Sequence, residues 1–398
     1  MLTAQSTKQF KFINIDRVAL TAAAAGLLSI FAAGFVTFKP NRIAAGEAFS
    51  LAASVPLQGF LAFLALWILV ALLSISGIRL EKQAVFTSIC GGSLLLLTFF
   101  LAGQYATTAT LEHGSISRIS PGTGMWIMVF AEVVLLLNAV QRGGERTRFV
   151  TALSAATVAG FVFLLLTGHL NDISIMKEYF NRQDRFFSEF KVHLLLATSS
   201  VGVATLLGIP LGILALKKKS LDAPTFFTLN ILQTIPSLAL FGILIPLLAY
   251  LSARYSLIRE IGVQGIGWAP AVTALTLYSI LPIARNTYAG FATVDPGALD
   301  AGLGMGMTRT QLLMKVEIPI ASPVILNGIR IALVQAIGLT AVAALIGAGG
   351  FGVFIFQGLG QAAVDLILLG AIPTILLAVA VDGITNWCIA VIQPRGIR

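Results

Sequence analysis

The stretch DAGLGMGMTRTQLLMKVEIP, residues 300–319, is glycine-rich and carries charges, although strongly apolar segments flank it on both sides. Just before it, Asp295 and Pro296 have the order of a helix start, because aspartate caps helix N-termini and proline at the first helical position loses no hydrogen bond. Gly304 and Gly306 are expected to weaken and end this helix, since glycine has the greatest backbone freedom and loses the most of it in a helix.

A second short helix is predicted directly after this break. Thr308 and Gln311 have the T-x-x-Q spacing of a capping box, and Pro319 is expected to end the helix that they start. The sequence therefore predicts a helix–break–helix over about residues 296–318, between two membrane spans. Such a segment is a rigid projection that another protein can hold.

The composition places the whole chain in a membrane. It has 398 residues, of which 57% are hydrophobic and only 11% charged, with a mean hydropathy of +0.92. Soluble domains carry about 25% charged residues, so one soluble core cannot cover this much apolar surface. The net charge of +9 is explained by basic loops that orient membrane helices, without a nucleic acid partner.

We therefore predict an all-α integral membrane protein with about ten transmembrane helices. The expected spans are residues 17–38, 56–78, 84–103, 122–140, 149–170, 192–216, 225–250, 266–288, 321–345 and 366–392.

The distribution of lysine and arginine predicts that both chain termini face the cytoplasm. With the N-terminus inside, 16 of the 26 basic residues fall in cytoplasmic segments, nine fall on the opposite side and Arg330 lies within a span. This bias agrees with the positive-inside rule, and it places residues 289–320 in the cytoplasm.

The chain divides near residues 170–190. Residues 1–170 contain five predicted spans, and residues 171–191 are expected to form one amphipathic helix at the extracytoplasmic surface, packed either on protein or on lipid. Residues 192–398 contain the remaining five spans and the segment described above.

Two polar regions are candidates for a translocation path. One polar cluster, interrupted by a proline, lies inside the predicted span 225–250, where polar groups need a partner or water. Its residues are Asn230, Gln233, Thr234, Pro236 and Ser237. The alternative is a proline kink whose free carbonyl bonds to a neighbouring helix. The glycine-rich stretch 347–365 is expected to be a gate, a re-entrant segment or an ordinary loop.

The segment at 300–319 resembles the cytoplasmic EAA motif of ATP-binding-cassette (ABC) importer permeases, E-A-A-x-x-x-G-x9-I-x-L-P. Asp300 stands at the position of its glutamate, Ala301 and Gly302 at its alanines, and Gly306 at its glycine. The end of the motif reads Val-Glu-Ile-Pro at residues 316–319. The spacing is complete, and the departures retain charge, small size or bulk.

Three further stretches narrow this resemblance to permeases for glycine betaine, choline and carnitine, which are osmoprotectants. They are GMGMT at 304–308, QTIPSLALFG at 233–242 and IGAGGFG at 346–352. The resemblance covers roughly residues 190–392 and implies a five-helix permease core over 192–398. Residues 1–170 are then an additional N-terminal membrane region.

The resemblance implies the transmembrane subunit of an importer in the bacterial inner membrane, and it implies that this chain is not an enzyme. No G-x-x-x-x-G-K-[ST] motif occurs, so ATP and Mg would be used by a separate ATP-binding subunit. The implied complex holds two such subunits, a second permease copy, most simply as a homodimer, and an extracytoplasmic substrate-binding protein. No cofactor or metal is expected on this chain.

The residues expected to couple the permease to its ATPase follow from the motif. They are Asp300, Ala301, Gly302, Gly304, Gly306 and Pro319. The small residues would allow close approach and the helix break, and Asp300 would hydrogen-bond or pair with the partner.

An ion-coupled secondary transporter is the alternative function. It would need acids within the membrane, and Glu132 in the span 122–140 is the best candidate, followed by Asp382. Such acids more often pair with a polar group on a neighbouring helix.

Overall fold

The computed structural model describes residues 15–42, 44–76 and 78–393, and the chain forms two compact units, Met1–Phe180 and Asn181–Arg398. Eight helices are long and apolar enough to cross a membrane, and a shorter apolar helix, Arg17–Ala32, precedes them. The chain is therefore an all-α membrane protein, as its composition predicts.

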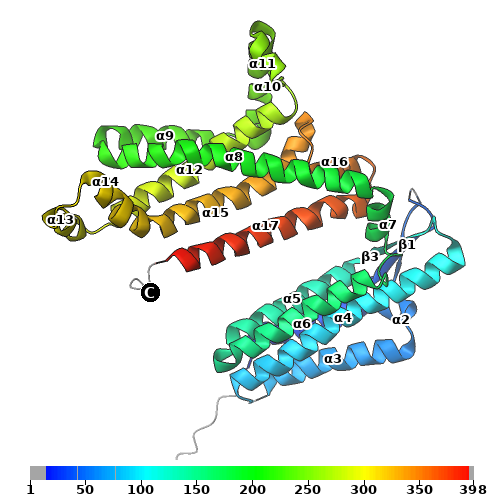
Figure 1. Cartoon of the computed structure of the whole chain (residues 1–398). Coiled ribbons are helices and arrows are strands. Elements are labelled where there is room, and N and C mark those ends of the chain that lie inside the picture. Colours follow the sequence, from blue (N-terminus) through cyan, green and yellow to red (C-terminus); the bar gives the residue numbers. More distant parts are fainter. Residues whose placement is uncertain (1–14, 43, 77, 394–398) are drawn as a thin grey trace, which may run out of the picture. The chain divides into compact units, whose positions relative to one another are not determined.

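Five long helices form the body of the first unit (Figure 1). They are α1 (Arg17–Ala32), α3 (Leu57–Ile75), α4 (Leu80–His113), α5 (Thr123–Arg142) and α6 (Thr147–Leu166), with the short α2 (Leu51–Ser54) before α3. Small residues allow these helices to approach closely. A Cβ added at Gly26 on α1 would lie 2.4 Å from the ring of Trp67 on α3, which is fully buried. Packing of this kind, rather than a hydrophobic drive between helices, holds helices together in lipid.

A three-stranded antiparallel sheet closes one end of the first unit, and the sequence analysis missed it. The strand order is β2 (Glu47–Phe49), β1 (Val36–Lys39), β3 (Arg118–Pro121), with Val36 opposite both Phe49 and Pro121. The predicted span 17–38 is therefore too long. α1 ends at Ala32, because the backbone is extended at Ala33, and the last residues of the predicted span belong to β1.

The short helix α7 (Ser174–Asn181) ends this unit and carries its main charged cluster. The buried Glu178 carboxylate lies 3.6 Å from Arg42 Nε and 4.0 Å from Arg118 Nε. Lys177 Nζ donates to Thr110 Oγ1 at 2.8 Å and lies 3.5 Å from Asp172 Oδ1. Burial lowers the pKa of the Lys177 ammonium, and the Asp172 charge opposes that shift.

The second unit is built around α12 (Trp268–Ala292). Its other helices are α8 (Gln183–Lys217), α9 (Lys219–Thr234), α10 (Ser237–Arg254), α11 (Ser256–Glu260), α13 (Pro296–Gly304), α14 (Arg309–Leu312), α15 (Ile318–Ala343), α16 (Gly352–Gly360) and α17 (Val364–Ile392). α12 packs against α8, α9, α10 and α15. Its buried residues are spread along its length, from Ala269 to Phe291, as expected for a helix that is covered by protein on several sides.

Close contacts fix the directions of these neighbours. α8 runs parallel to α12, since Thr276 Oγ1 donates to Ser200 O at 3.2 Å and a Cβ at Gly212 would lie 2.5 Å from Ala284 O. α15 runs antiparallel to α12, since a Cβ at Gly290 would lie 2.9 Å from Ala321 O and a Cβ at Gly328 would lie 2.8 Å from Pro282 O.

Two predicted elements differ from the structure. The expected amphipathic helix over 171–191 is two helices, because α7 ends at Asn181 and α8 begins at Gln183 and continues without a stop to Lys217. The predicted span 225–250 is also two helices, α9 and α10, which are separated at Ile235 and Pro236.

Candidate functional site

The helix–break–helix predicted from the sequence lies between α12 and α15, at one end of the second unit (Figure 1). Asp295 caps α13 by accepting from Gly297 N at 3.0 Å, and Pro296 occupies its first turn. α13 ends at Gly304, and Gly306 has a φ of +82°, a conformation that glycine adopts without strain. The predicted break is therefore confirmed.

The capping box of the second short helix is also confirmed. Gln311 N donates to Thr308 Oγ1 at 3.3 Å, and Thr308 N donates to Gln311 Oε1 at 2.9 Å. These bonds satisfy two of the N–H groups that a helix N-terminus leaves free. α14 therefore has a defined start directly after the break.

Pro319 does not end this helix, contrary to the prediction. A π-helical turn, Leu313–Glu317, follows α14 and leads directly into α15, with Pro319 in the first turn of α15. Proline destabilises helix interiors, because it cannot donate a hydrogen bond and its ring clashes with an earlier carbonyl. The wider π turn changes the bonding register at this point, so the helix continues from Arg309 to Ile346.

The expected coupling residues lie on α13, in the break and at the start of α15, and most of them are exposed. They are Asp300, Ala301, Gly304, Gly306 and Pro319. Gly302 is the buried exception: a Cβ at this position would lie 2.5 Å from Leu312 Cδ1. Gly302 therefore allows α13 to fold back onto α14, while its neighbours are available to a partner.

Large apolar side chains add to this surface, and the sequence analysis did not identify them. Leu303 is 50% exposed, Met305 is 73% exposed and Met314 is 62% exposed. The signal that could have identified them in the sequence is that they are apolar residues within a charged segment between two spans. We call α13, the break, α14 and the π turn, residues 296–317, the projecting segment.

The polar cluster expected along the path surrounds the break between α9 and α10. Gln233 Nε2 donates to Tyr278 O at 2.8 Å, and Tyr278 Oη donates to Ile235 O at 2.5 Å. α12 thus satisfies the carbonyl next to Pro236, as in the proline-kink alternative. Asn230, Thr234 and Pro236 are exposed, whereas Ser237 at the start of α10 is half-buried.

The glycine-rich stretch after α15 is an ordered turn and helix. Gly347, Gly349 and Gly350 have positive φ values, and α16 follows. Two side chains of α8 hold the turn: Glu189 Oε2 accepts from Gly350 N at 2.7 Å, and His193 Nδ1 accepts from Phe351 N at 3.2 Å.

The two intramembrane acids have different surroundings. Glu132 on α5 is fully buried and accepts a 2.7 Å hydrogen bond from Thr98 Oγ1 on α4. Asp382 on α17 forms a two-point ion pair with Arg330 on α15, with Arg330 Nε to Oδ1 at 2.6 Å and Nη2 to Oδ2 at 3.0 Å. Each acid therefore has a partner on a neighbouring helix.

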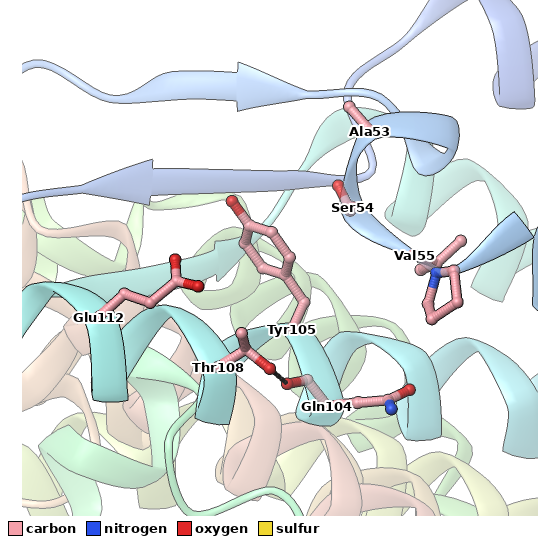
Figure 2. Close-up of a pocket in the computed structure, with 8 residues that line it drawn as sticks. Ala53, Ser54, Val55, Gln104, Tyr105, Thr108 and Glu112 are labelled. Atoms are coloured by element: carbon pink, nitrogen blue, oxygen red, sulfur yellow. Dashed lines mark hydrogen bonds between the residues drawn. The ribbon is translucent and has the colours of Figure 1, made fainter.

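The first unit has an open pocket of about 310 Å³ (Figure 2). Gln104, Tyr105, Thr108 and Glu112 of α4 form one side of it, and residues 53–56 form the other. Thr108 bonds to the carbonyl of Gln104, as the dashed line in Figure 2 shows. These residues have no counterpart among the features expected from the sequence.

Comparisons with known proteins divide the chain in the same way. The family model "Binding-protein-dependent transport system inner membrane component" matches residues 204–396, and the model "ABC transporter permease YehY, N-terminal domain" matches residues 16–176.

Curated relatives match about half of this chain and most of their own length. The osmoprotectant import permease protein OsmW of Salmonella typhimurium strain LT2 is 45% identical over 206 residues, which are 52% of this chain and 91% of OsmW. The glycine betaine/carnitine/choline transport system permease protein OpuCD of Bacillus subtilis strain 168 is 40% identical over 207 residues, which are 52% of this chain and 83% of OpuCD.

Apolar helices of spanning length, with a capped and exposed helix–break–helix at one end, fit the class of multi-pass membrane permeases. This chain belongs to the family of binding-protein-dependent transport system inner membrane components, the permease subunits of ABC importers. It is a multi-pass protein of the inner membrane, as expected. Family membership also removes the basis for the alternative of an ion-coupled transporter.

Proposed function

We propose that this chain forms the translocation path of an importer for quaternary-amine osmoprotectants, such as glycine betaine or choline. The relatives named for these solutes support the proposal, since they match the chain over most of their own length. Residues 192–398 are the permease core in this proposal, and residues 1–170 are an accessory membrane region. A pair of these chains would bind two ATP-binding subunits and an extracytoplasmic binding protein, and both chain termini would face the cytoplasm.

The projecting segment is the proposed docking site for the ATP-binding subunit. The observation that carries this assignment is the exposure of Leu303, Met305 and Met314 on a short, doubly capped segment. Exposed apolar side chains gathered on one projection mark a surface that a partner covers. Asp300 would pair with a basic or N–H group of the partner, and the ATP-binding subunit would hydrolyse ATP with Mg.

Motion of the projecting segment would reach the membrane through two helices. α12 enters the segment and α15 leaves it, and the second connection is helical throughout. A helix transmits displacement because its backbone hydrogen bonds are internal.

Co-purification and uptake test the docking assignment together. The permease is expressed with its ATP-binding subunit and binding protein, and ATP-driven uptake of labelled glycine betaine is measured in proteoliposomes. Asp300→Lys reverses an exposed charge, and Gly306→Leu places a branched side chain at a φ of +82°. We expect each variant to lose the ATP-binding subunit during purification. We expect its ATP-driven uptake to fall at least tenfold.

Arg254→Gln, a change at the end of α10, is the control, since Arg254 is exposed and lies outside the projecting segment. It should keep both activities within about twofold. Intact assembly and uptake in Asp300→Lys and Gly306→Leu would show that docking occurs elsewhere.

A further inference from the structure

We propose that Arg330, Asp382 and Asn386 line the translocation path and contact the charged groups of a zwitterionic solute. This inference rests on the proposed function and assigns a solute-contacting site within it. Its basis is a charged cluster inside the membrane-spanning part of the second unit that protein covers only in part.

The cluster lies in the interior of two helices that are long enough to cross the membrane. Arg330 lies about 18 Å along α15 from the start of that helix, at about 1.5 Å per residue. Asp382 lies about 15 Å from the end of α17 by the same measure. Charged side chains at such a depth face the interior of a bundle or a water-filled cavity, because hydrocarbon does not solvate them.

The cluster is nevertheless open on one side. The Arg330 side chain is 28% exposed and the Asp382 side chain 42% exposed. A Cβ added at the adjoining Gly383 would meet no atom within 4 Å. The ion pair therefore requires either water or another molecule over this face, and a permease path supplies both.

The guanidinium group of Arg330 retains capacity to bind. Its Nε and Nη2 donate to Asp382, and its Nη1 is 3.4 Å from Asn386 Oδ1. Arginine has five N–H groups, so one N–H on each terminal nitrogen remains without a partner among residues 78–393. These two parallel donors suit a carboxylate.

The pair thus presents both charges that a zwitterionic solute needs. The carboxylate of a betaine would bind the free edge of Arg330, and its quaternary ammonium group would lie near the Asp382 carboxylate. Choline has the same ammonium group and no carboxylate, so it would use Asp382 alone. Since the charges of Arg330 and Asp382 are already balanced, the site would hold the solute weakly enough to release it.

The test compares a zwitterion with a cation in the same complex. Wild-type and Arg330→Gln permeases, each assembled with the ATP-binding subunit and saturating binding protein, are reconstituted into proteoliposomes. Maximal ATP-driven uptake of labelled glycine betaine and of labelled choline is measured for each. We expect Arg330→Gln to lower the ratio of betaine to choline uptake at least tenfold.

Arg285→Gln is the matched control, because it removes an exposed arginine from the same unit, on α12 over the Phe226 ring. Its uptake ratio should remain within twofold of wild type. Arg330→Asp/Asp382→Arg separates binding from structure: it retains an ion pair but exchanges the positions of the charges. We expect it to assemble with the ATP-binding subunit and to transport betaine at least tenfold more slowly than wild type.

Two outcomes overturn the inference while leaving the proposed function intact. One is an unchanged uptake ratio in Arg330→Gln. The other is wild-type betaine uptake by Arg330→Met/Asp382→Leu, which would assign the pair a purely structural role. By contrast, a wild-type complex that transports neither solute with ATP, even with bound binding protein, would contradict the proposed function itself.

Discussion

The two units differ in how far charged side chains within their spanning helices are exposed. In the first unit, Glu132 is completely buried and bonded to Thr98. In the second unit, Arg330 and Asp382 remain partly exposed in spanning helices. Because lipid does not solvate such groups, this face of the second unit needs further protein or water.

The two units also differ in the features at their ends. The projecting segment of the second unit exposes Leu303, Met305 and Met314. The sheet of the first unit instead has paired strands and ion pairs at Glu178. The projecting segment is therefore the surface that we propose for a partner.

Gly302→Val should have the largest effect, because it breaks the projecting segment of the second unit. A Cβ at this position would lie 2.5 Å from Leu312 Cδ1, so α13 must move away from α14. We expect ATP-driven uptake to fall at least tenfold while the chain is still inserted, as measured in proteoliposomes. Gly297→Ala on the same helix, where the new Cβ makes ordinary contacts at 3.4 Å, should keep uptake near wild type. Normal uptake in Gly302→Val would contradict the proposal that the projecting segment of the second unit couples the permease to its ATP-binding subunit.

His193→Ala should have an intermediate effect on the second unit. It removes the acceptor of the buried Phe351 N–H, and leaving such a group without a partner costs about 1–3 kcal/mol. We expect a thermal unfolding midpoint several degrees lower in detergent and faster proteolysis between residues 346 and 352. Glu189→Gln, which keeps an acceptor oxygen for Gly350 N, should change the midpoint less. Equal stability of His193→Ala and wild type would show that the His193 bond does not stabilise this turn.

Glu132→Gln should have the smallest effect on transport, because Glu132 belongs to the closed first unit. Glutamine keeps an oxygen that accepts from Thr98 Oγ1, so the internal bond survives. We expect ATP-driven uptake within about twofold of wild type and full dependence on ATP. Loss of uptake, or uptake driven by an ion gradient without ATP, would revive the alternative in which Glu132 couples an ion to transport.

Local sequence rules predicted the projecting segment because its signals lie within a few residues of each other. Asp295, Gly306, Thr308 and Gln311 each act on backbone groups at most three residues away. The outcome at Pro319 shows where such rules fail. Whether a proline ends a helix depends on the bonding of the preceding turn, and the π turn is not encoded by any one residue.

Features that depend on distant contacts were not predictable from the pattern. The strands β1 and β3 are separated by two long helices, α3 and α4, and each strand is only four residues long, the lower limit of the runs that mark a strand in a sequence. The pairing of Arg330 with Asp382 likewise depends on how α15 packs against α17. Apolar periodicity identified both helices, but it does not specify which faces of them meet.

The π turn between α14 and α15 has a consequence for how movement enters the bilayer. A π turn bonds each N–H to the fifth carbonyl before it, and such turns are points where helices bend. Pushing residues 296–312 would therefore flex the connection at this turn. A change in the tilt of α15 is the expected response.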